Sequence, residues 1–282
     1  MTRRILLCTD MDRTLIPNGP QPESASARNI FHQLVARNEI TLAYVTGRHL
    51  AIILQAINTY QLPKPDYIIS DVGSTIYESG PQGWTHWQEW ENEIAPCWAN
   101  KSHADIKALL NDLSLLRLQE VQKQNTHKLS YYVPLHADRE QLIQDIESRL
   151  QQAKVRAGII WSIDEPAAIG LIDIVPANAS KRHAIEFLME KQNFHIQDTV
   201  FAGDSGNDLQ VITSPIQSVL VANTSDEVRN LALEQTQQQG LEDTLYIALG
   251  DFYGMNGNYS AGIIEGLAHF IPETEQWIAD LI

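Results

Sequence analysis

Short apolar runs alternate with stretches of helical periodicity in the N-terminal part of the chain. Residues 4–10 (RILLCTD), 40–46 (ITLAYVT) and 66–70 (DYIIS) are apolar runs of the length of a buried strand. Between them, 23–37 and 49–60 repeat apolar residues three and four positions apart, which is the period of an α-helix. This order predicts a parallel sheet covered by helices.

The pattern changes in the middle of the chain, where strands are expected to follow one another without a helix for each. The expected elements there are helices over 104–113 and 138–153 and strands over 127–133, 157–163 and 169–175. Such a mixture is typical of an α+β domain. We therefore predict that residues 80–173 form an inserted domain and that 1–79 and 174–282 together form the core domain.

The alternation of strands and helices resumes after the insertion. Strands are expected over 199–203 and 218–222, and helices over 180–192, 225–235 and 260–270. Right-handed crossovers would wind the five core strands into a parallel sheet. If the fourth strand lies beside the first, the spatial order is 3-2-1-4-5, which is an α/β, doubly wound arrangement.

Composition and charge narrow the class of protein. The 282 residues, of which 44% are hydrophobic, suffice for a large core. The formal net charge of -15 argues against nucleic acid or an anionic membrane as a partner, although a local cation can reverse the field at one small site. The apolar runs are too short to span a membrane, and charges follow the N-terminus too closely for a signal peptide. With two cysteines, Cys8 and Cys97, we expect no disulfide framework and predict a cytoplasmic protein.

Acidic residues stand where two of the predicted core strands end. Asp10 and Asp12 follow the first strand, and Asp204 and Asp208 follow the fourth. In the predicted order these strands are neighbours at the point where the winding direction reverses, and ligands bind outside the carboxyl ends of strands there. Four carboxylates in one crevice repel one another unless a cation lies between them. Because oxygen-rich sites suit Mg²⁺, we expect Mg²⁺ as the cofactor.

Two further residues are suited to binding a phosphate at this crevice. Thr46 ends the second strand just before a predicted helix, whose free N–H groups attract anions. Lys181 opens a helix shortly before the fourth strand, and its ammonium can neutralise a phosphoryl group. Taken singly, each motif also fits an ordinary turn or a solvated side chain. Their order along one α/β pattern favours a common site.

The motifs together resemble those of the haloacid dehalogenase superfamily of phosphotransferases. DMDRT (10–14) is similar to its first motif, VTGR (45–48) to its second, Lys181 to its third and GDSGND (203–208) to its fourth. The insertion before Lys181 resembles the C2-type cap of members that hydrolyse sugar phosphates. The resemblance implies a Rossmann-like parallel sheet with an inserted α+β cap domain that determines substrate specificity.

The resemblance also implies a role for each motif residue. Asp10 is implied to be the nucleophile that forms an aspartyl-phosphate, and Asp12 the acid that protonates the leaving oxygen and then the base that activates water. An acid at the place of Asp12 is a feature of phosphatases and is lacking in the family's dehalogenases and ion pumps. The implied metal ligands are Asp10, Asp12 through its backbone carbonyl, Asp204 and Asp208; the implied phosphate-binding residues are Thr46, Gly47, Lys181 and Asn207; and Arg48 is implied to contact the substrate.

Three stretches of the chain are similar to the sucrose-6-phosphate phosphatase family. They are SDVGSTIY (70–77), WTHWQEW (84–90) and QEVQKQNTHKLSYYV (119–133). In that family a glutamate, a glutamine and a lysine of the last stretch contact sugar hydroxyls, and the matching residues are Glu120, Gln124 and Lys128. The alternative is that these three are surface or packing residues of the cap, which is the usual state of such side chains.

The leading hypothesis is a Mg²⁺-dependent phosphatase of sucrose biosynthesis that hydrolyses sucrose-6-phosphate to sucrose and phosphate. Departures from the family pattern at Arg13, His49 and Arg182 leave every catalytic group in place and bear on substrate preference. A second hypothesis is a phosphatase for mannosyl-3-phosphoglycerate or glucosylglycerol phosphate, and the lack of Lys and Arg in 78–100 disfavours the former, more anionic substrate. A third is a non-catalytic, sugar-phosphate-binding partner of a synthase, and a sugar-phosphate synthase is also a candidate partner of an active enzyme.

Overall fold

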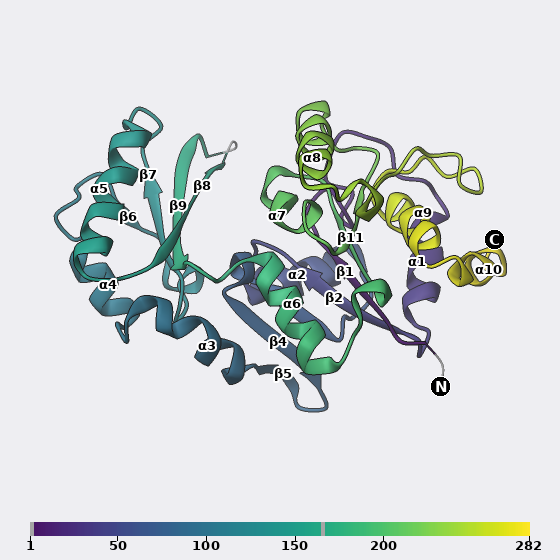
Figure 1. Ribbon diagram of the computed structural model, residues 1–282, viewed down its shortest axis with the longest axis horizontal. Helices are drawn as coiled ribbons and strands as arrows, with labels where there is room; N and C mark the ends of the chain where they lie inside the picture. The colour runs from purple at the N-terminus through teal and green to yellow at the C-terminus, as the bar shows by residue number, and fades with distance from the viewer. Residues whose placement is uncertain (1–2, 165–166) are drawn as a thin grey trace.

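The computed structural model describes residues 3–164 and 167–282, which form two β-sheets with helices packed around them (Figure 1). In this part of the chain, eight strands make the larger sheet, in the order β12-β11-β10-β1-β2-β3-β4-β5. The five predicted core strands correspond to β1, β2, β3, β10 and β11, so the predicted order 3-2-1-4-5 is confirmed. The strands of this sheet are β1 (Ile5–Thr9), β2 (Ile40–Val45), β3 (Tyr67–Ser70), β4 (Thr75–Gly80), β5 (Gly83–His86), β10 (Thr199–Gly203), β11 (Gln217–Leu220) and β12 (Leu245–Ile247).

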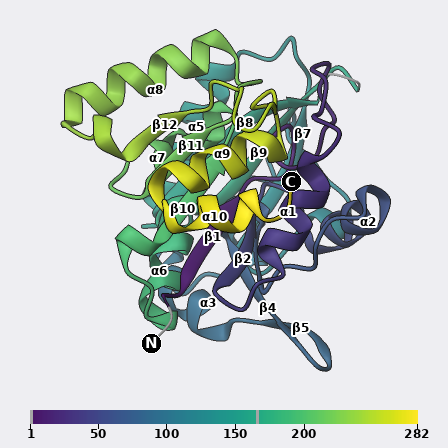
Figure 2. The same ribbon diagram turned by 90° about the vertical axis from the view of Figure 1, so that its right-hand side faces the viewer.

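Helices cover both faces of the larger sheet because its central strands are apolar on both sides. Neighbouring residues of a strand point to opposite faces, so Leu6 and Leu7 of β1 enter different hydrophobic cores. One core includes residues of α1, α2, α9 and α10, and the other includes residues of α3, α6, α7 and α8; Figure 2 shows α9 and α10 lying across the strands. These helices are α1 (Ala27–Val35), α2 (Leu50–Tyr60), α3 (Gln88–Ile94), α6 (Lys181–Gln192), α7 (Leu209–Ile212), α8 (Asp226–Gln239), α9 (Ser260–Phe270) and α10 (Glu273–Ala279).

The second sheet is antiparallel, has the order β6-β7-β9-β8 and lies at the other end of the molecule from α9 and α10 (Figure 1). It has its own hydrophobic core, in which residues of α4 and α5 pack against alternate residues of β7 and β9. The predicted helices over 104–113 and 138–153 and the predicted strands over 127–133, 157–163 and 169–175 correspond to elements of this group. They are α4 (His103–Leu109), β6 (Arg117–Leu118), β7 (Leu129–Val133), α5 (Arg139–Gln152), β8 (Ala157–Asp164) and β9 (Ile169–Pro176).

Several elements were not predicted from the sequence, and most lie at sheet edges or are short. Strands β4 and β5 form an antiparallel hairpin at the edge of the larger sheet. β5 thus pairs with the larger sheet, although its residues fall within 80–173, the range predicted to form the inserted domain. Its residues Gly83–His86 are partly or fully exposed, so they carry little hydrophobic signal. Helix α3 follows and packs its Trp90 and Ile94 into the core that α6 also enters. The division of the chain into domains at 80 and 173 therefore remains a prediction.

Among the described residues, no helix combines the length and the apolar character needed to cross a bilayer. Cys8 and Cys97 are buried and unpaired. Short 3₁₀ segments connect the longer elements and are found at Asp71–Gly73, Ala95–Trp98, Val121–Lys123, Ile196–Asp198, Gly206–Asp208 and Glu242–Thr244.

The turn after β3 lies directly against the start of α6. Gly73 has a backbone φ of 92°, in the left-handed region, and a Cβ atom placed on it would lie 2.3 Å from the carbonyl carbon of Ser180. Ser180 caps α6 by accepting a hydrogen bond from the backbone N–H of His183 to its Oγ at 3.1 Å. Glycine is therefore needed at residue 73 for both conformation and space.

Replacing Gly73 by alanine should lower the free energy of unfolding by about 3 kcal/mol, because two backbone segments would have to separate. Urea denaturation followed by circular dichroism measures this loss. Gly158→Ala is a matched control, because its Cβ would meet its nearest neighbour, Val175, at an ordinary 3.6 Å. Equal losses for the two variants would contradict the close approach described here.

Candidate active site

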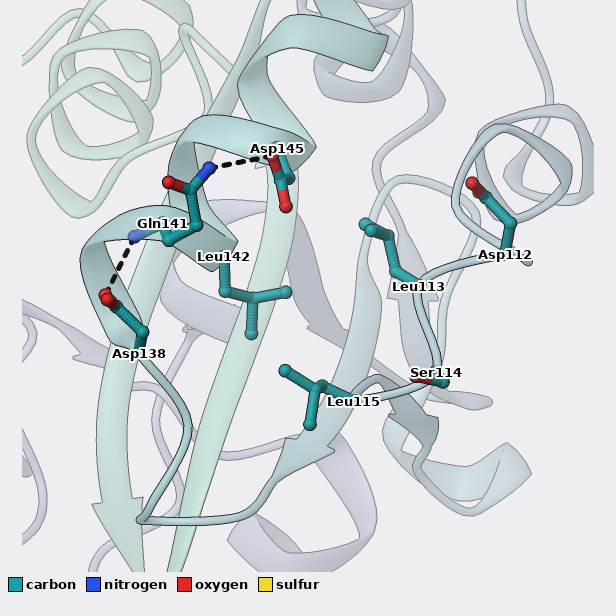
Figure 3. Close-up of a pocket in the computed structure, with 8 residues that line it drawn as sticks. All are labelled: Asp112, Leu113, Ser114, Leu115, Asp138, Gln141, Leu142 and Asp145. Carbon is teal, nitrogen blue, oxygen red and sulfur yellow. Dashed lines mark hydrogen bonds between the residues drawn. The ribbon is translucent and has the colours of Figure 1, made fainter.

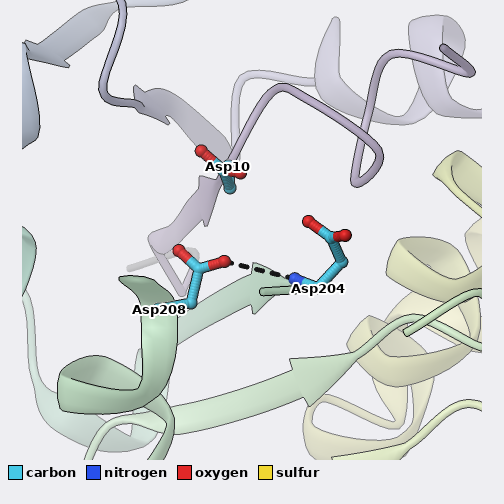
Figure 4. A group of neighbouring side chains, drawn as sticks. All are labelled: Asp10, Asp204 and Asp208. Atoms are coloured by element: carbon cyan, nitrogen blue, oxygen red, sulfur yellow. Dashed lines mark hydrogen bonds between the residues drawn. The ribbon is translucent and has the colours of Figure 1, made fainter. Parts of the chain in front are cut away.

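The carboxyl ends of β1 and β10 bring three aspartates together. The two strands pair in parallel, so Asp10 and Asp204, the residues that follow them, lie side by side. Asp208 reaches the same point from the turn that follows β10, and one carboxylate oxygen of each residue lies within 4.8 Å of the others (Figure 4). All three residues are buried. The predicted convergence of distant acidic residues on one crevice is therefore present in the fold.

Lys181, the first residue of α6, supplies the positive charge among these carboxylates. Its Nζ donates hydrogen bonds to Asp10 Oδ1 at 3.0 Å, to Asp208 Oδ1 at 2.7 Å and to Asn207 Oδ1 at 2.9 Å. The side chain is 2% exposed, so these bonds replace the water that the ammonium loses on burial.

Asp208 also organises the loop that carries Asp204. Its Oδ2 accepts hydrogen bonds from the backbone N–H groups of Asp204 and Ser205, each at 3.2 Å. One oxygen of Asp208 thus holds the loop and the other contacts Lys181. Gly203 leaves room for this side chain, because a Cβ there would lie 2.7 Å from Asp208 Cγ.

The electrostatics of the cluster favour a cation. Burial raises the pKa of Asp10 to about 8; Lys181 opposes this shift, and Asp208 and Asp204 add to it. Burial and the charge of Asp208 raise the pKa of Asp204 to about 6. Burial alone would lower the pKa of Lys181, but Asp10 and Asp208 outweigh it and raise that pKa above its ordinary value. One ammonium thus does not fully compensate the carboxylates, and their oxygen donors fit a hard divalent ion such as Mg²⁺.

Asp12 lies at the mouth of the crevice and is held from two sides. The Arg48 guanidinium forms two hydrogen bonds to it, from Nε to Oδ2 at 2.7 Å and from a terminal nitrogen to Oδ1 at 2.5 Å. Asn18 donates a third, to Oδ1 at 2.7 Å. This ion pair raises the pKa of Arg48. The side chain of Asp12 remains 40% exposed and can contact a ligand that enters from solvent.

The crevice forms a cleft of about 250 Å³ that collects most of the predicted catalytic and phosphate-binding residues. Thr46 is the first residue after β2 and is buried. Helix α2 begins only at Leu50, so the turn 46–49 lies between the strand and the helix. Lys181 reaches the cleft through its bonds to Asp10 and Asn207. The residues that line the cleft are Asp10, Asp12, Arg13, Thr46, Gly47, Arg48, Asp204, Ser205 and Asn207.

A second cavity of about 280 Å³ adjoins the cleft and lies between the two sheets. The two share Gly47, Arg48 and Asn207, so a ligand can extend from one into the other. The remaining lining of this second cavity comes mainly from β8, β9 and the loop before β7, and its residues are His49, Ile52, Val72, Gln119, Lys123, Lys128, Ile160, Trp161, Ser162, Leu171 and Asp173.

The three residues assigned to sugar binding have different surroundings. Lys128 is buried and lines the second cavity. Glu120 is exposed and accepts a hydrogen bond from Tyr132 at 2.7 Å. The side-chain amide of Gln124 is bonded to the backbone around it. It donates hydrogen bonds to the carbonyl oxygens of Gln119 and Ser130 and accepts one from the Ser130 N–H. In this structure neither Glu120 nor Gln124 lines the cleft or the second cavity.

Several cavity residues were not predicted as site residues. Asp173 stands inside the apolar run IGLIDIV (169–175), and a charged residue within such a run is a signal in the sequence that could have indicated a site residue. His49 was noted only as a departure from the family pattern. Gln119 and Lys123 gave no signal, because polar residues in a loop are ordinarily solvated.

A separate groove of about 250 Å³ lies between the loop 112–115 and α5 and shares no lining residue with the cleft (Figure 3). Its carboxylates have structural partners. Asp138 caps α5 through the Gln141 N–H, Asp145 accepts from the Gln141 side chain, and Asp112 pairs with Arg149.

Curated relatives resemble the chain over nearly its whole length. A haloacid-dehalogenase-like hydrolase of Nitrosococcus oceani is 51% identical over 278 residues, which cover 99% of this chain and 75% of that protein. A mannosylfructose-phosphate phosphatase of Agrobacterium fabrum is 26% identical, with coverage of 94% and 96%.

A solved structure and a family model agree with this likeness. The structure of the sucrose-phosphatase from Synechocystis, in complex with sucrose and phosphate, superposes with a TM-score of 0.72 at 24% identity and covers 95% of this chain and 98% of that one. It shows that the fold is shared. A model of the family described as sucrose-6F-phosphate phosphohydrolase matches residues 3–271. The chain is therefore a sugar phosphatase with the haloacid dehalogenase fold, and it belongs to the sucrose-6F-phosphate phosphohydrolase family.

Proposed function

We propose that the protein is a Mg²⁺-dependent phosphatase that hydrolyses sucrose-6-phosphate to sucrose and phosphate through an aspartyl-phosphate. The observation that carries the proposal is a buried aspartate, Asp10, which belongs to an acidic cluster and contacts Lys181 at the base of a cleft. The cleft continues into a second cavity lined by polar and aromatic side chains. Membership of the family supports this choice of substrate.

The proposed reaction has two steps. The Asp10 carboxylate attacks phosphorus and forms an acyl-phosphate bond, while the bond between phosphorus and the sugar oxygen breaks and Asp12 gives its proton to that oxygen. Asp12 then takes a proton from a water molecule, which attacks the same phosphorus and releases phosphate from Asp10. Asp12 is suited to both transfers because it lies at the solvent-exposed mouth of the cleft.

The other residues position the phosphoryl group. Thr46, Gly47 and Asn207 line the cleft, where backbone and side-chain donors bind phosphate oxygens. Lys181 neutralises charge on the phosphoryl group from the buried side. Asp10, Asp204 and the backbone carbonyl of Asp12 would hold Mg²⁺, with Asp208 in support, and the ion would stabilise negative charge on the phosphoryl oxygens.

The second cavity is suited to an uncharged sugar. Its cations have acidic partners: Arg48 pairs with Asp12, Lys123 with Glu120 at 3.5 Å, and Lys128 with Asp71 and Asp173 at 3.2 and 3.7 Å. Hydroxyl groups can share such paired ions, whereas a carboxylate would compete with the acidic partners. This disfavours mannosyl-3-phosphoglycerate.

Phosphate esters of other uncharged sugars are the second candidates for the substrate. The likeness to a mannosylfructose-phosphate phosphatase supports a second disaccharide phosphate, and a 25% identical relative, a glucosylglycerol-phosphate synthase of which the chain covers 31%, supports glucosylglycerol phosphate. The likeness to this synthase also supports a sugar-phosphate synthase as a candidate partner.

A non-catalytic binding role is disfavoured, because Asp10, Asp12, Lys181 and Asp204 are all present. A cytoplasmic role in sucrose biosynthesis completes the proposal.

Asp10→Asn should abolish phosphate release, because an amide cannot replace the attacking carboxylate. We expect kcat with the best sugar phosphate to fall by roughly 10⁴-fold, measured as released phosphate. Asp280→Asn, at a surface residue that accepts a hydrogen bond from Gln276, is the matched control and should keep its activity. A folded Asp10→Asn variant with the kcat of the control would refute the proposed nucleophile.

Removing the metal should abolish activity, and added Mg²⁺ should restore it and raise the melting temperature, since the ion relieves repulsion among the three buried aspartates. Asp204→Asn should need roughly 10²-fold more Mg²⁺ for half-maximal activity. Metal titrations of activity and of thermal unfolding measure both effects. Full activity after exhaustive chelation would show that the acidic cluster serves another purpose.

A panel of phosphate esters should identify the substrate. We expect the highest kcat/KM for sucrose-6-phosphate, and a value at least about 10-fold lower for mannosyl-3-phosphoglycerate, because the Lys and Arg side chains that the structure describes in the second cavity already have acidic partners. Mannosylfructose phosphate, glucosylglycerol phosphate and a small aryl phosphate complete the panel. Preference for the glycerate ester would contradict the argument from charge pairing.

A further inference from the structure

Three successive residues in the turn after β3 adopt the left-handed backbone region. The φ angles are 52° at Asp71, 60° at Val72 and 92° at Gly73. Only glycine enters this region without cost, and a β-branched residue such as valine is a rare occupant. Strain of this kind persists where the surroundings enforce it, and it concentrates at functional sites.

The backbone of this turn is bonded to the segment that lines the phosphate cleft. The N–H of Asp71 donates to the carbonyl of Arg48 at 3.0 Å, and the N–H of Val72 donates to the carbonyl of Thr46 at 3.1 Å. The Val72 side chain lies next to Gly47, since a Cβ built on that glycine would be 3.8 Å from Val72 Cγ2. A displacement of the turn would therefore move Thr46, Gly47 and Arg48.

The side chain of Asp71 faces the other way, toward the second sheet. Its buried carboxylate forms an ion pair with the buried Lys128, from Oδ1 to Nζ at 3.2 Å, and accepts a hydrogen bond from Ser70 at 3.1 Å. Lys128 belongs to the loop before β7 and lines the second cavity, where it also meets Asp173 of β9 at 3.7 Å. Asp71 thus connects a residue of the proposed sugar cavity with the backbone of the proposed phosphate cleft.

We infer that Asp71 is a positioning residue that couples sugar binding to phosphate binding, an inference that rests on the proposed function. A sugar hydroxyl that bonds to Lys128 draws its ammonium away from Asp71. Because Asp71 is in a strained turn bonded to Thr46 and Arg48, the change in this ion pair is transmitted to the phosphate-binding segment. Each ligand then alters the affinity of the other by the same factor.

The coupling is measured with the two products, in the presence of Mg²⁺, by calorimetric titration. The sugar is the one released from the best substrate of the panel, and it is titrated with and without saturating inorganic phosphate. In the wild-type protein we expect phosphate to tighten sugar binding by about 10-fold. In Asp71→Asn this factor should fall to about 1.

Asp173→Asn is the matched control, because Asp173 contacts the same ammonium but has no bond to the phosphate-binding segment. We expect this variant to bind sugar more weakly and to keep the coupling factor. Val72→Gly retains the carboxylate and relaxes the strained turn, so it should reduce the coupling while remaining folded. It provides the test if Asp71→Asn does not fold.

The outcomes separate the inference from the proposed function. An unchanged coupling factor in folded Asp71→Asn or in Val72→Gly, or an equal loss in Asp173→Asn, would overturn the inference and leave the phosphatase proposal intact. Absence of any coupling in the wild-type protein would also overturn it. If no sugar phosphate of the panel is hydrolysed, the proposed function and the inference fail together.

Discussion

The arrangement of the site depends on the bonds between the Lys181 ammonium and Asp10, Asn207 and Asp208. These groups come from the end of β1, from the turn after β10 and from the first residue of α6; Asp10, Asp208 and Lys181 are buried, whereas Asn207 is exposed. A buried carboxylate without a counter-charge would be costly, so the position of α6 is tied to that of the two strands. The three aspartates still carry more negative charge than this ammonium neutralises, so their oxygens are suited to bind a divalent ion.

The sequence predicted the central strands, their order and most helices, because those elements are buried on two faces or strongly periodic. It did not reveal the β4–β5 hairpin, whose strand β5 is partly or fully exposed along its length. Asp10, Thr46, Lys181 and Asp204 could be grouped in advance because they stand at ends of recognisable elements. Lys128 and Asp71 are 57 residues apart in the sequence and lie on segments next to different sheets. The hydrophobic pattern within a short window of sequence cannot indicate a contact over such a separation.

The proposed chemistry and the proposed substrate selectivity are assigned to different parts of the molecule. The cleft is built from turns at the carboxyl edge of the larger sheet, whereas most of the adjoining cavity comes from the second sheet and the loop before β7. Glu120 and Gln124 belong to that loop but engage their own neighbours in this arrangement. They reach a sugar only if the loop rearranges, whereas Lys128 already lines the cavity.

The ion pair between Asp71 and Lys128 has a consequence for how substrate preference can change during evolution or design. A graft that exchanges the entire insertion for one without a lysine at this place would remove the ammonium and leave a buried carboxylate unpaired in a strained turn. Such chimeras should be viable only when residue 71 is exchanged together with the graft. The two sheets have largely separate hydrophobic cores, but they depend on each other at this ion pair and where Asn125 donates hydrogen bonds to Ser74 and Thr75 at 3.1 Å.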